Sequence, residues 1–145
     1  MTTARRAQSG TSMLEVLVSI VVLTIGALGA AGMQISSLRD TGSASNRFRA
    51  VSLAQGMSDS LRADRSSAVK GGGQFESAIA AGACTAADVV PVTRWQNQIA
   101  CDLPSGKGGV SVDTFTKRAI VTVEWDDSRG SRGSTAQQFV LETRL

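Results

Sequence analysis

The feature that most restricts this chain is an uncharged apolar run near its N-terminus. From Val16 to Leu38 no Asp, Glu, Lys or Arg occurs, whereas charged residues recur every few positions beyond Leu38. As an α-helix the run from Val16 to Met33 would be about 27 Å long, at about 1.5 Å per residue. That length is close to the hydrocarbon thickness of a bilayer. The run therefore predicts a membrane-spanning helix rather than the core helix of a soluble domain.

The charges before this run predict its orientation. Arg5 and Arg6 precede the apolar residues, and basic residues favour the cytoplasmic side of a membrane. The rest of the chain would then lie across the membrane, in the periplasm if the protein is bacterial. An ordinary secretory signal is the alternative, with a small-x-small cleavage site after the run. Residues 27–32 could imitate such a site, but the apolar pattern continues beyond Met33 into a longer helix.

Glu15 stands at the start of the apolar run, where a carboxylate is costly and requires a partner. The simpler interpretation is that Glu15 is solvated at the level of the lipid headgroups. The other interpretation needs a new positive group. Cleavage after Gly10 would create an α-amino group on Thr11, four residues before Glu15 and on the same helix face. Amine and carboxylate could then pair within one subunit or between neighbours.

The segment SG-TSMLEVLVSIVVLTIGALG resembles the class III signal of type IV prepilins. That signal is a short basic leader ending in glycine, a processed residue, and a glutamate at the fifth mature position of an apolar helix. The resemblance implies cleavage between Gly10 and Thr11 by a prepilin peptidase, followed by N-methylation of Thr11. It also implies that Glu15 guides docking into a filament by pairing with the N-terminal amine of a neighbouring subunit.

The chain departs from the prepilin pattern in two places. Thr11 stands where that family most often has phenylalanine, and the apolar helix has no proline. Major pilins usually kink at a proline there, whereas this chain has Gly26, Gly29 and Gly32. Glycines lower helix stability in water by up to about 1 kcal/mol each relative to alanine. They permit close helix packing, although ordinary membrane-helix composition explains them equally well.

Beyond the apolar run the pattern predicts that the helix continues to about residue 65 as an amphipathic segment. Thr41-Gly42-Ser43 is a weak point at which we expect the helix to bend. The apolar stripe recurs at intervals of three and four, as expected of a helix with one buried face. Its members are Phe48, Val51, Ala54 or Gln55, Met57 or Ser58, and Leu61.

The remaining residues predict a small sheet. After a glycine break at 70–73, residues 74–87 are alanine-rich and predict a short helix plus a loop. Residues 94–101 predict a short helix with Trp95 and Ile99 facing inward, and residues 103–109 a turn-rich loop. Alternation begins at Val110 and Val112 and extends toward Phe115, and it is clearest over residues 119–125. Residues 126–134 are predicted to form a loop and residues 137–145 the last strand.

The expected fold class is α+β. A long N-terminal helix, first transmembrane and then amphipathic, packs on an antiparallel sheet of three or four strands, as in type IV pilins. Three regions follow from this interpretation. Residues 1–10 are a cleaved leader, residues 11–38 are the transmembrane and assembly half of the helix, and residues 39–145 are a periplasmic head.

Composition argues against most catalytic and metal chemistry. The chain has no histidine and two cysteines, so a Ser-His-Asp triad cannot form and a zinc site is poorly supplied. The Asp126-Asp127 pair offers too few oxygen ligands for calcium on its own and suits a strand entering a turn. Lys107 in its glycine-rich loop lacks the spacing of a phosphate cradle. We expect no enzyme activity, no cofactor and no metal.

The remaining charges and the two cysteines support a structural role. Basic and acidic residues are interspersed, at a net charge of +3, so a nucleic-acid partner is not expected. In an oxidising compartment Cys84 and Cys101 would form an intramolecular disulfide, which is worth roughly 3 kcal/mol for a loop of this length. Two buried free thiols are the alternative.

The second half of the chain resembles a narrower group. Together LAQGMSDSLRAD, RWQNQIACDLPSGKGGV and VTVEWDD look like the type IV pilus modification protein, the PilV-type minor pilin. This implies a structural subunit in a minor-pilin complex that primes pilus assembly at the tip. Its partners would be other minor pilins, the major pilin, the prepilin peptidase and the inner-membrane assembly platform. A minor pseudopilin of a type II secretion system and a membrane-anchored periplasmic binding module are the alternatives.

Overall fold

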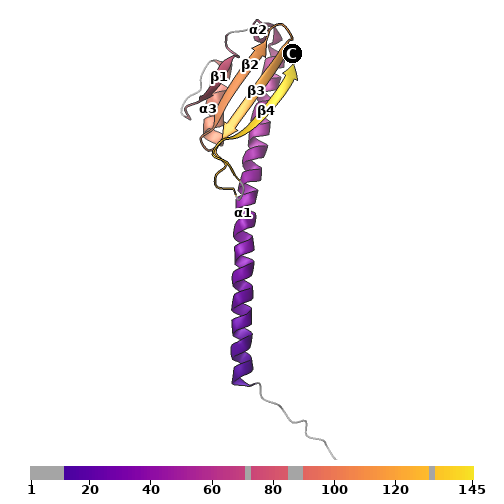
Figure 1. Cartoon of the computed structure of the whole chain (residues 1–145). Coiled ribbons are helices and arrows are strands. Elements are labelled where there is room, and N and C mark those ends of the chain that lie inside the picture. The colour runs from indigo at the N-terminus through magenta and orange to yellow at the C-terminus, as the bar shows by residue number, and fades with distance from the viewer. Residues whose placement is uncertain (1–11, 71–72, 85–89, 131–132) are drawn as a thin grey trace, which may run out of the picture. The chain divides into compact units, whose positions relative to one another are not determined.

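The structure is a computed structural model, and it describes residues 12–70, 73–84, 90–130 and 133–145. The chain divides into two compact units, the first ending at Leu38 and the second running from Arg39 to Leu145. Helix α1 (Met13–Ala63) contributes residues to both units (Figure 1).

The described part of the first unit is the N-terminal half of α1. All its side chains are exposed, including large apolar ones such as Leu14 (72%), Leu23 (74%) and Leu28 (74%). Among the described residues, α1 is the helix long and apolar enough to cross a membrane, by length and composition. So large an apolar surface is not stable in water and requires lipid or other protein around it.

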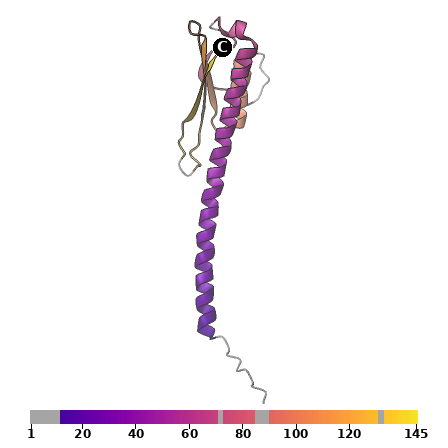
Figure 2. The same cartoon turned by 90° about the vertical axis from the view of Figure 1, so that its right-hand side faces the viewer.

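The second unit is a four-stranded antiparallel sheet with helices on one face (Figure 2). The strands are β1 (Ser77–Ala81), β2 (Lys107–Asp113), β3 (Arg118–Trp125) and β4 (Gln137–Arg144), in the order β1-β2-β3-β4. The C-terminal part of α1 and helix α3 (Pro91–Asp102) pack on the sheet, and the short α2 (Arg65–Ala68) follows α1. The predicted α+β fold, with a long N-terminal helix on an antiparallel sheet, is confirmed.

The buried stripe of α1 differs from the predicted one at its start. Phe48 is 77% exposed and Val51 is half-buried, whereas Ala50 and Leu53 are buried. Ala50 and Leu53 belong to the core of the head, so the buried face of α1 is turned away from Phe48. The prediction was right from position 54 onward. The buried members of α1 are Ala50, Leu53, Ala54, Met57, Ser58 and Leu61.

Over the described residues 74–84 the predicted short helix is wrong, because strand β1 forms there. Residues 85–87 of this prediction lie outside the described residues. Alanine favours helix intrinsically, but here pairing with β2 outweighs that preference. The buried Gln96 of α3 adds to this by donating from Nε2 to the hydroxyl of Ser77, at 2.9 Å. The glycine break is followed by a bend and turn at residues 73–75.

The loop predicted over residues 103–109 is shorter than expected, because β2 already begins at Lys107. A Cβ at Gly108 would lie 2.5 Å from atoms of both Ile99 and Trp95. A Cβ at Gly109 would lie 2.7–2.9 Å from atoms of Ile79 on β1. Here the glycines do not mark a turn; they permit close packing on both faces of a strand.

Of two further strand predictions, the extension of β2 to Phe115 is wrong and the alternation over residues 119–125 is correct. Phe115 does not extend β2: it lies in the β2–β3 turn and is 93% exposed. Asp113 ends the strand by accepting the backbone N–H groups of Phe115 and Thr116 at Oδ1. The alternation over 119–125 is confirmed, since Val121, Val123 and Trp125 are buried. Trp95 and Ile99 also face inward from α3, as predicted.

Candidate functional site

The strongest candidate site is the first turn of α1. The helix starts where the backbone N–H groups of Glu15 and Val16 donate to the carbonyl of Ser12, at 2.9 and 3.3 Å. Glu15 therefore lies in the first turn, where the helix dipole favours a negative charge. Its neighbours are apolar and exposed, with Met13 at 90% and Leu14 at 72%. An ionisable group is thus set into the edge of an apolar surface.

Within the described residues no side chain pairs with the Glu15 carboxylate. Its backbone carbonyl accepts a hydrogen bond from the hydroxyl of Ser19 at 2.7 Å, while the carboxylate is exposed. Gly10 and Thr11 lie outside the described residues, so cleavage between them and methylation of Thr11 stay predictions. A charged group that enters an apolar environment needs an opposite charge nearby. For Glu15 this positive charge would come from a residue outside the described ones or from another subunit.

The glycines of the apolar helix do not pack against any of the described residues. A Cβ at Gly26, Gly29 or Gly32 would meet nothing within 4 Å. These positions are spaced by three residues, so they lie near one another on the helix surface. They remain open to close packing by a second helix, or they reflect ordinary membrane-helix composition.

The predicted disulfide is present between Cys84 and Cys101, whose Cα atoms are 4.9 Å apart. It joins the segment after β1 to the last turn of α3. Both residues are exposed, so the bond lies at the surface of the head.

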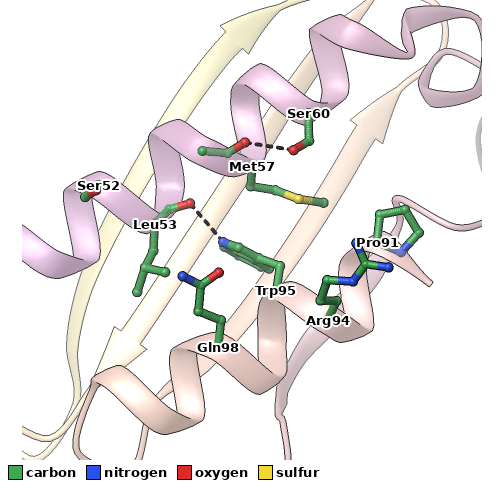
Figure 3. Close-up of a pocket in the computed structure, with 9 residues that line it drawn as sticks. Ser52, Leu53, Met57, Ser60, Pro91, Arg94, Trp95 and Gln98 are labelled. Carbon is green, nitrogen blue, oxygen red and sulfur yellow. Dashed lines mark hydrogen bonds between the residues drawn. The ribbon is translucent and has the colours of Figure 1, made fainter. Parts of the chain in front are cut away.

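A groove of about 390 Å³ lies between α1 and α3 on the head (Figure 3). Its floor is fixed by Trp95, whose Nε1 donates to the carbonyl of Leu53 at 2.9 Å. The groove brings together no nucleophile and general base of the kind that hydrolysis requires. Its lining residues are Ser52, Leu53, Gly56, Met57, Ser60, Pro91, Arg94, Trp95 and Gln98.

Charged side chains of the sheet contact partners on neighbouring strands, and these contacts account for them as structural residues. Lys107 Nζ contacts Glu124 Oε1 at 2.8 Å, and Gln138 donates to Glu124 Oε2 at 2.7 Å. The Lys107 hydrogen bond, helped by Gln138, lowers the pKa of Glu124 below its ordinary value. Lys107, considered above for phosphate binding, is thus engaged by a neighbouring strand. Among the described residues, no three His, Cys, Asp or Glu side chains gather as a metal site.

Asp127 is the polar residue whose placement the sequence did not reveal. It does follow a strand, as predicted, but it is 2% exposed. Its Oδ2 accepts a hydrogen bond from the hydroxyl of Ser43 on α1. The sequence offers no signal for this contact, because the two residues are 84 positions apart and both belong to segments rich in polar residues.

Comparison with protein families supports the N-terminal assignment. The family model described as the prokaryotic N-terminal methylation motif matches residues 5–31, which include Gly10, Thr11 and Glu15. Searches of curated proteins and of solved structures found no match. The chain thus carries the N-terminal methylation motif of type IV pilin-like proteins on an apolar helix, in a pilin-like α+β fold. The motif implies processing by a prepilin peptidase and assembly partners of the pilus kind. The apolar helix is consistent with anchoring in the inner membrane.

Proposed function

We propose that this protein is a minor pilin of a type IV pilus, similar to the PilV-type pilus modification protein. In this role it is a low-abundance subunit that joins other minor pilins in a complex that primes assembly at the pilus tip. Its leader is removed after Gly10, Thr11 is methylated, and the head lies in the periplasm before incorporation. The support for the minor class is the resemblance of residues in α1, α3 and β3 to that group.

The observation that carries the proposal is the exposed Glu15 carboxylate, in the first turn of an apolar helix and inside the matched methylation motif. In the membrane an unpaired carboxylate is costly. A neighbouring subunit with a free N-terminal amine relieves this cost when the helices pack together. Glu15 would thereby favour entry into the filament over remaining alone in the bilayer.

The test is to replace Glu15 with glutamine in the host and to count pili and incorporated subunits. Glu15→Gln removes the charge with little change in volume. We expect normal accumulation and processing of the subunit but at least a roughly tenfold loss of incorporation, as for a lost charge pair of about 1.4 kcal/mol or more. The matched control is Glu142→Gln, which removes a carboxylate from an exposed ion pair with Arg118 that is worth little.

Incorporation of Glu15→Gln at the level of the control would contradict the proposal and favour a membrane-anchored binding module. Deletion of the gene separates the two filament classes. Loss of surface pili with intact protein secretion fits a minor pilin, whereas the reverse phenotype identifies a pseudopilin of a type II secretion system.

A further inference from the structure

The segment of α1 just after the boundary between the two units is held by a polar contact rather than by the core. The buried residues of α1 begin at Ala50. About two turns earlier, the half-buried Ser43 donates its hydroxyl to the Asp127 carboxylate. The residues between Ser43 and Ala50 are exposed except for the half-buried Asn46.

Asp127, the acceptor in this contact, is fixed in place by hydrogen bonds of its own backbone. The N–H of Asp127 donates to the carbonyl of Ser134 at 2.8 Å, and the carbonyl of Asp127 accepts from the N–H of Gly130 at 2.9 Å. A Cβ at Gly133 would collide with the carbonyl oxygen of Asp127, so this closure requires glycine there. The carboxylate is therefore presented to α1 from the turn at residues 127–130.

The turn also approaches the helix itself. A Cβ at Gly130 would lie 3.1 Å from the Cβ and 3.3 Å from the hydroxyl of Ser43. Such close approach brings the backbone of the turn against the helix at one point. Asp127 is 2% exposed, so the hydroxyl of Ser43 donates to a carboxylate that has little access to water. Leaving a buried charged acceptor without its donor costs free energy of folding.

We propose that Ser43 and Asp127 form a latch that holds α1 helical where it enters the head. Thr41-Gly42-Ser43 is a weak helix-forming sequence, because glycine and β-branched or hydroxyl residues favour other conformations. The structure nevertheless keeps these residues helical. The latch restricts fraying or bending of α1 to residues before Thr41, so the helix segment from Ser43 onward moves with the head as one body. This inference does not depend on the pilus assignment.

The test is hydrogen exchange of the full-length protein in a membrane mimetic, read in peptides that cover residues 39–47 and 118–125. Ser43→Ala should speed exchange in 39–47 by about tenfold or more, as expected when a buried charged acceptor loses its donor. Exchange over 118–125 in β3 should be unchanged. Alanine is a better helix former than serine, so propensity alone predicts slower exchange.

The matched control is Ser45→Ala, which changes an exposed serine in the same stretch of helix and should leave exchange unchanged or slower. Asp127→Asn keeps an acceptor for the Ser43 hydroxyl and should give a smaller effect than Ser43→Ala. In the double variant Ser43→Ala/Asp127→Asn the effects should not add, because both act through one contact. Unchanged exchange over 39–47 in Ser43→Ala would overturn the latch. Faster exchange over 118–125 as well would also overturn it, since the contact would then support the whole head.

Discussion

At the scale of single residues, the carboxylates of the head differ in what stabilises their charge. The hydroxyl and backbone N–H of Thr116 lower the pKa of Asp113. The N–H of Ser128 does the same for Asp126. Lys107 and Gln138 lower the pKa of Glu124, which bridges two strands. All three groups therefore bind protons less readily in the folded chain than in the unfolded one.

This direction predicts how stability depends on pH. A carboxylate with a lowered folded pKa stabilises the fold above its unfolded pKa, which for Glu is 4.5. That contribution is lost as the pH falls through the folded pKa. We expect the free energy of unfolding, followed by Trp95 and Trp125 fluorescence in urea, to decrease between about pH 5 and about pH 3. Glu124→Gln should reduce this slope, and an unaltered slope would show that Glu124 contributes nothing.

Single residues are also where reasoning from sequence failed. Helical spacing predicts that the apolar Phe48 belongs to the buried stripe, yet Ala50 and Leu53 are the buried residues. The choice depends on which side of α1 the rest of the head packs against, and helical periodicity cannot report this. The burial of Asp127 likewise depends on a turn closing against α1, so only the folded chain reveals it.

At the scale of elements, the local sequence pattern predicts the type of secondary structure correctly where that type depends only on the element's own residues. The alternation of β3 and the amphipathic spacing of α3 are local and gave the correct type of element. The alanines of β1 carry no strand pattern and favour a helix, yet the segment is a strand because it pairs with β2. The glycines of β2 suggest a turn when the sequence is considered alone. Their actual role is close packing against α3 and β1, and these elements come together only in the folded chain.

The packing of β1 on β2 can be tested at Gly109. Gly109→Ala places a Cβ 2.8 Å from the backbone nitrogen of Ile79, so β1 must shift. We expect a loss of about 1–3 kcal/mol in the free energy of unfolding, measured by urea denaturation. Gly56→Ala is the control, since a Cβ there meets nothing within 4 Å in a helix and should be stabilising by up to about 1 kcal/mol. Equal effects at the two sites would contradict this placement of β1.

At the scale of the whole molecule, the head is a small core supported by one covalent link. The Cys84–Cys101 bond closes a loop with a separation of 17 residues. The double variant Cys84→Ser/Cys101→Ser should therefore lose roughly 3 kcal/mol of stability, seen as a lower melting temperature. Thiol titration of the denatured wild type should find free thiols only after reduction. Equal thiol counts with and without reductant would show that the cysteines are unpaired.

The central claim for the whole molecule is that the chain is processed so that Thr11 becomes a methylated N-terminus facing Glu15 in an assembly. The most direct measurement is the intact mass and N-terminal sequence of the protein from membranes, with and without the host's prepilin peptidase. We predict a chain beginning at methylated Thr11 that appears only when the peptidase is present. A chain beginning at Met1 in both strains, or one cut after the apolar run, would contradict the account.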